Sequence, residues 1–201
     1  MPKATFRPWV GERYGRGSQW GLSVLLLGES HYDEGFGQGD RLTEYVIRRH
    51  IRGDGRQYAF WTKIAHTFTD SPYETEASRD RFWQSVGFYN YVQEFAGTGP
   101  RQRPTPQQFA RSWPAFNDVL GQLQPDVIVV LGFGLWDALC PMLPSRHNLE
   151  AAPLGRRVPS YAVIPAAAGI IGYIKHPSTG FRPADWRPWV SELMAVAQRR
   201  T

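Results

Sequence analysis

Residues Val127–Gly132, with the sequence Val-Ile-Val-Val-Leu-Gly, form an uninterrupted apolar run of strand length. Such runs are typical of strands covered on both faces, as in parallel sheets. Three further stretches are predicted as strands of the same sheet: Leu22–Gly28, Val86–Asn90 and Ile170–Ile174. Helical patterns separate these four stretches. The expected fold is therefore α/β, a three-layer α/β/α sandwich around a central, mostly parallel four-stranded sheet.

The helical patterns are amphipathic or begin at capping residues. Thr105 followed by proline predicts a helix start, and Pro114 is expected to kink or restart that helix. The predicted helices run from Asp40 through Arg49, over Gln57–Phe68 and Thr75–Gln84, from Thr105 through Leu123, and over Phe133–Leu139 and Asp185–Gln198. Tyr161–Ile164 is predicted as another short strand, whereas Pro8–Gly15 and Ser145–Pro159 are predicted as loops.

The length indicates one domain over residues 1–201. The composition, 42% hydrophobic and 14% aromatic, suffices for a core. The sequence has no apolar stretch of about 18 residues, the length that crosses a bilayer, and no leading secretory region. Cys140 is the only cysteine, so no internal disulfide is possible. These features predict a cytoplasmic monomer without a membrane partner.

The chain is basic, with a net charge of +5 and a pI of about 9.6. Only three of its 23 basic residues are lysines. Arginine matches phosphate oxygens with a planar fork of donors, so the charge is compatible with a polyanionic partner. A GC-rich genome, which favours arginine codons, would explain the same bias.

Polar or small residues follow each predicted strand. They are Gly28–Tyr32, Asn90, Gly132–Gly134 and the His176-Pro177-Ser178 segment. In open α/β sheets, ligands bind outside the carboxyl ends of the strands. If the strands are parallel, these four segments converge on one crevice.

The order of these segments resembles that of the uracil-DNA glycosylase superfamily. Leu25–Tyr32, with its Gly-Glu-Ser-His-Tyr end, is similar to the family's first motif. Trp83–Asn90 is similar to the segment that carries the base-reading asparagine, and Val129–Gly132 to the strand and glycine before a family helix. His176-Pro177-Ser178 matches the last motif. The resemblance extends from Leu22 to Phe181, although few residues are identical.

The resemblance implies a DNA N-glycosylase that flips uracil or another altered base into a pocket and hydrolyses its glycosidic bond. Asn90 would read the base, and Gly28 and Tyr32 would shape the pocket. His176 would stabilise the departing base as a neutral imidazole. The alternatives for Asn90, Tyr32 and His176 are a turn residue, a packed aromatic and a cap at a strand end.

The last motif would also supply DNA contacts. Ser178 and Thr179 would meet a phosphate, Phe181 would be the apolar wedge, and Arg182 would be a further phosphate contact. Phe181 and Arg182 are also compatible with ordinary surface positions.

One position departs from the family pattern. Ser30 occupies the place where the best-known branch has a water-activating aspartate. A serine is no equivalent base without a partner, so Glu29 or Asp33 is the candidate that activates water. Either carboxylate could also be a loop cap or ion-pair partner.

Other chemistries have weaker support. His31, Asp33, Glu34 and His176 are possible metal ligands by type, but their spacing matches no tight ligand motif. Gly132-Phe133-Gly134 lacks the third glycine of a dinucleotide loop. No metal and no cofactor is expected. Two further functions stay open: a catalytically silent nucleic-acid-binding module, and an enzyme acting on another small substrate.

Overall fold

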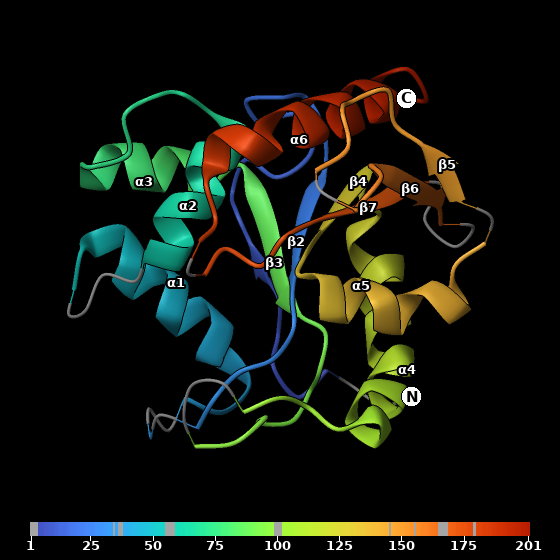
Figure 1. Ribbon diagram of the computed structural model, residues 1–201. Coiled ribbons are helices and arrows are strands. Elements are labelled where there is room, and N and C mark those ends of the chain that lie inside the picture. Colours follow the sequence, from blue (N-terminus) through green and yellow to red (C-terminus); the bar gives the residue numbers. More distant parts are fainter. Residues whose placement is uncertain are drawn as a thin grey trace.

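The chain folds around one mixed sheet with helices packed on it (Figure 1). The computed structural model describes residues 4–33, 35, 38–54, 59–98, 102–144, 146–154, 156–164, 169–178 and 180–201. The seven-stranded sheet has the order β1-β3-β2-β4-β7-β6-β5. Its strands are β1 (Trp9–Val10), β2 (Val24–Gly28), β3 (Val86–Asn90), β4 (Val127–Leu131), β5 (Arg146–Asn148), β6 (Ser160–Val163) and β7 (Ile170–Ile174).

The four strands predicted from the sequence form the centre of this sheet. β3, β2, β4 and β7 are neighbours, and every pair among them is parallel. The sheet is nevertheless larger than four strands. β1 pairs antiparallel with β3, and β6 and β5 continue the sheet antiparallel beyond β7. β1 and β5 lie in stretches predicted as loops, because strands of two and three residues carry no pattern of their own.

The helices are α1 (Leu42–Arg52), α2 (Ala59–Phe68), α3 (Glu76–Trp83), α4 (Pro106–Leu123), α5 (Phe133–Leu139) and α6 (Pro183–Gln198). Two 3-10 turns, η1 (Gly39–Arg41) and η2 (Cys140–Met142), adjoin α1 and α5. The sequence predicts a kink or a restart at Pro114; the restart is wrong, since α4 continues through it. Pro114 is exposed, so its ring lies on the solvent side of the helix. Within the described residues, no helix is long and apolar enough to cross a bilayer.

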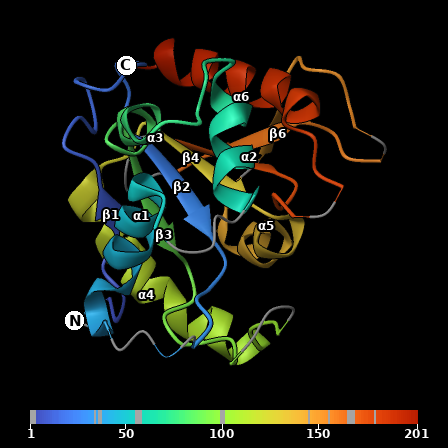
Figure 2. The ribbon, with the colours of Figure 1, turned by 90° about the vertical axis from the view of Figure 1, so that its left-hand side faces the viewer.

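One face of the sheet is covered by α1, α2, α3 and α6. Phe88 of β3 contacts Trp61 of α2 with ring centroids 5.3 Å apart, and the same tryptophan packs on Trp83 of α3. A β-carbon at Gly172 of β7 would contact Leu193 of α6. Phe88 and Gly172 lie in one row across the sheet, so these helices share a face (Figure 2).

The opposite face is covered by α4 and α5. In the next row of the sheet, Tyr89 stacks on Phe116 of α4 at 6.3 Å. Tyr173 stacks on Trp136 of α5 at 4.7 Å. Because successive side chains of a strand point to opposite faces, α4 and α5 lie on the far side from α2 and α6. The sheet is thus covered by helices on both faces.

The chain leaves β2 and β4 in opposite directions. After β2 it passes to α1 on one face, and after β4 it enters α5 on the other. β2 and β4 are adjacent, so the two segments that follow them separate to opposite faces at this edge of the sheet. Such a reversal is where ligands bind in open α/β sheets.

Candidate functional site

Three of the residues predicted for the site meet at one edge of the sheet. Asn90 and Gly28 end the neighbouring strands β3 and β2, in register with each other. His176 follows β7 and lies against Gly132, which follows β4; a β-carbon at position 132 would be 3.5 Å from Cβ of His176. Three strand spacings put the ends of β3 and β7 roughly 14 Å apart.

Asn90 holds a buried amide at this edge. Its residue is 6% exposed, and its side chain lies over Gly28 so closely that a β-carbon there would overlap Oδ1. Among the residues that the structure describes, none forms a hydrogen bond with this side-chain amide. The side chain therefore has a donor and an acceptor to offer to a ligand.

His176 lies at the surface with one side of its ring covered. Phe60, near the start of α2, packs on the imidazole with ring centroids 5.2 Å apart. This partial removal from water lowers the pKa of His176 below its ordinary value; Arg103 lowers the pKa further, whereas Glu29 opposes both. The imidazole is therefore neutral at pH 7.

Two lysines hold the turn that carries His176. Lys63 of α2 donates through Nζ to the backbone oxygen of Ser178 at 2.6 Å, and Lys175 donates to that of Gly180 at 3.1 Å. Neither ammonium group has a carboxylate partner in the described part of the chain. The turn is thus positioned by positive charges that remain unneutralised.

Glu29 is paired with a residue that the sequence analysis missed. Arg103 Nη2 lies 2.8 Å from Glu29 Oε2, with the carboxylate side chain 21% exposed and the arginine 62% exposed. The guanidinium also covers Gly134 at the start of α5, where any β-carbon would overlap it. Arg103 therefore links the segments after β2 and β4. The sequence shows that the stretch before α4 carries arginines, but it does not show that Arg103 pairs with Glu29.

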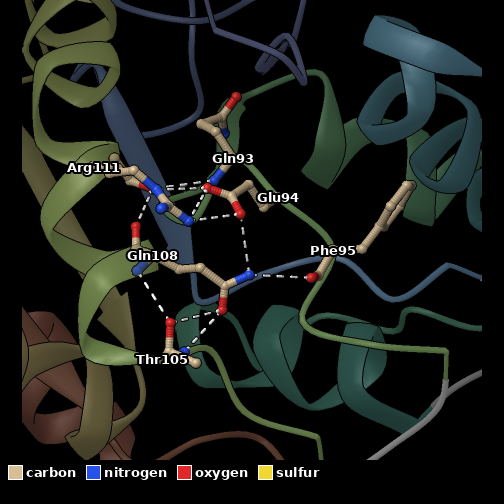
Figure 3. Close-up of polar contacts among 7 residues, drawn as sticks. Gln93, Glu94, Phe95, Thr105, Gln108 and Arg111 are labelled. Atoms are coloured by element: carbon tan, nitrogen blue, oxygen red, sulfur yellow. Dashed lines mark hydrogen bonds and ion pairs between the residues drawn. The ribbon is translucent and has the colours of Figure 1, made fainter.

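A polar network joins the segment after β3 to the first turns of α4 (Figure 3). Thr105 caps α4 in a reciprocal box with Gln108, whose Nε2 also donates to Glu94 and to the backbone oxygen of Phe95. Arg111 forms a two-pronged pair with Glu94. The segment after Asn90 is thereby tied to the start of α4, two residues beyond Arg103.

Tyr32 and Asp33 lie at a different cavity. They line a cavity of about 630 Å³ together with Phe6, Gln93 and Phe95, and neither Asn90 nor His176 lines it. Asp33 accepts a hydrogen bond from the backbone N–H of Gly35 at 3.1 Å, as a loop cap does. The structure therefore brings Glu29, rather than Asp33, to His176.

The remaining predicted residues fall into four groups. Ser30 is half-buried and has no hydrogen-bonding side-chain partner among the described residues, whereas Ser178 and Arg182 are exposed, with Arg182 paired to Asp185. Thr179 and Glu34 lie outside the described residues. Phe181 is 3% exposed and stacks on Trp186, so it is a core residue rather than the expected wedge. Its burial arises from α6, which the local sequence does not reveal.

Within the described residues, no three His, Cys, Asp or Glu side chains are grouped to hold a metal ion. No protein-family model matches the sequence, and no curated protein matches it either.

Proposed function

We propose that this protein is a DNA glycosylase of the uracil-DNA glycosylase type, which hydrolyses the N-glycosidic bond of uracil or another altered base. The side-chain amide of Asn90, which has no hydrogen-bonding partner among the described residues, carries this proposal. One C=O and one NH₂ group match the edge of a pyrimidine.

His176 fits the leaving-group step. When the bond between the sugar C1′ and the base nitrogen breaks, the electron pair stays on the base, and negative charge reaches its carbonyl oxygen. A neutral imidazole can donate a hydrogen bond to that oxygen. The lowered pKa of His176 keeps this form at neutral pH.

Glu29 is the candidate for water activation. It is the predicted carboxylate that interacts with His176, and it follows Gly28 directly. A carboxylate here would accept a proton from the water that attacks C1′ and would stabilise positive charge on the sugar. The proton would later pass to the departing base, which balances the hydrolysis.

The DNA backbone is proposed to follow the positive side of the crevice. Lys63 and Lys175 lie at the turn after His176, and Arg182 is 80% exposed at the start of α6. Cations at this edge attract phosphates irrespective of sequence. This placement leaves the acidic cavity lined by Asp33 away from the DNA.

The direct test is release of free base from single- and double-stranded oligonucleotides that contain uracil or another altered base. We expect Asn90→Ala and His176→Ala each to lower turnover by about 100-fold or more. Asn117→Ala and His147→Ala are matched controls, because both residues are exposed, Asn117 within α4 and His147 within β5. Absence of base release from every substrate would exclude the enzymatic proposal.

A catalytically silent nucleic-acid-binding module is the second candidate. The observation in its favour is that Ser30 stands at the expected base position while Glu29 is neutralised by Arg103. Salt-dependent oligonucleotide binding without base release would support it.

A further inference from the structure

We propose that Arg103 acts as an anion-responsive latch on Glu29. A phosphate group that enters between the segments after β2 and β4 binds the guanidinium, which then leaves the carboxylate of Glu29 unpaired. The inference deepens the proposed function, on which the identity of the anion as a DNA phosphate rests. It assigns to Arg103 a positioning role for the site rather than a place among the reacting groups.

The position of Arg103 is the first support. Its guanidinium lies against both Glu29, after β2, and Gly134, after β4, at the edge of the sheet where these two segments separate. An anion that enters there meets this group before it reaches Glu29. Phosphate oxygens accept from the arginine fork as a carboxylate does, so the two anions compete for the same donors.

The strength of the pair is the second support. One contact, from Nη2, is 2.8 Å, whereas the contact from Nε to the other carboxylate oxygen is 3.4 Å. The arginine side chain is 62% exposed. Pairs this exposed contribute little to stability, so a doubly charged anion suffices to displace one.

The anchoring of the backbone is the third support. Thr105 begins α4 with a capping box, and Gln108 ties that turn to Glu94 and Phe95 (Figure 3). The chain two residues after Arg103 is therefore fixed. The long side chain can swing between two partners while its origin stays in place.

The pKa of His176 depends on whether Arg103 is paired with Glu29. Phe60 covers its ring, and the charged groups that act on its pKa are Glu29, which raises it, and Arg103, which lowers it. Lys63 and Lys175 lie nearby but donate to backbone oxygens of the turn. Opening the latch leaves Glu29 unneutralised, so the pKa of His176 must rise.

The experiment is an NMR titration of the His176 imidazole in the full-length protein. Sulfate is the probe, because its charge is constant over the titration, and sodium chloride at equal ionic strength is the reference. In the wild-type protein, we expect sulfate to raise the pKa of His176 by about half a unit. In Arg103→Gln, the pKa should start higher, and sulfate should not move it.

Gly134→Ala displaces the guanidinium without removing its charge, because the added methyl group overlaps it. We expect this variant to start with the raised pKa of His176. Gly121→Ala is the matched control, since it adds the same methyl group to a helix in open space. Arg103→Lys keeps the charge but not the fork, so its response to sulfate should be smaller than that of the wild type.

An equal sulfate response in wild type and Arg103→Gln would overturn the latch, and so would an unchanged pKa in Gly134→Ala. The measurement needs no base release. A responsive latch in a protein that releases no base therefore contradicts only the proposed function, whereas an active glycosylase without the response contradicts only the latch.

Discussion

The side-chain oxygen of Asn90 occupies the space that a side chain at position 28 would need. Gly28 and Asn90 are register partners at the ends of adjacent parallel strands, so the strand pairing brings them together. The glycine is thus required by the close approach of the amide.

Gly28→Ala should therefore destabilise the protein by about 1–3 kcal/mol, because the methyl group forces Asn90 and Phe88 to move. Urea unfolding measures this loss. Gly121→Ala, with nothing within 4 Å of the added carbon, is the control and should not be destabilised. Equal stability of the two variants would contradict the close approach.

Asn90→Ala should change the free energy of unfolding by less than about 1 kcal/mol while lowering base release, because no hydrogen bond among the described residues is lost. Gln93→Ala provides the contrast. Gln93 accepts from the backbone N–H of Phe6 and donates to the backbone oxygen of Asn90, so its loss should cost about 1–3 kcal/mol. A large loss of stability in Asn90→Ala would indicate a structural role for the amide.

Base release should depend on the neutral form of His176. Because the pKa of His176 is lowered, turnover should be flat at neutral pH and should fall only as the pH drops below the ordinary histidine range. A pH–rate profile at saturating oligonucleotide measures this dependence. A rate that rises on acidification through that range would mean that the imidazolium, not the imidazole, is active.

Acid should weaken the fold through His31. Burial lowers the pKa of His31 to about 4, and its Nε2 lies 2.9 Å from Thr43 Oγ1. Between pH 6.5 and pH 4, the unfolded chain binds a proton that the folded protein excludes, so stability falls as the pH falls. The loss should reach roughly 2–3 kcal/mol at pH 4. His31→Gln should make the curve of unfolding free energy against pH shallower over this interval.

Phe181→Ala should destabilise the protein by about 3 kcal/mol, because it empties a core position against Trp186. The affinity for oligonucleotides, measured where the variant is still folded, should remain that of the wild type. Full stability together with weakened binding would restore the wedge that the sequence suggests.

The sequence by itself determined the local elements. Apolar runs predicted the central strands, including the bounds of β3 and β7, because a strand buried on both faces leaves a continuous pattern. Thr105 marked the start of α4, because a cap depends on neighbours within one turn. The parallel arrangement then followed, and with it the meeting of Asn90 and His176 at one edge.

Only the tertiary structure decided which side chains act on one another there. Glu29 and Arg103 are 74 positions apart. They meet only because folding brings the segment after β2 and the segment before α4 together, so no local pattern predicts their ion pair. For the same reason Phe181 became a core residue and Asp33 turned toward another cavity. Periodicity and capping are local interactions that a sequence displays, whereas pairing and burial depend on segments brought together by folding.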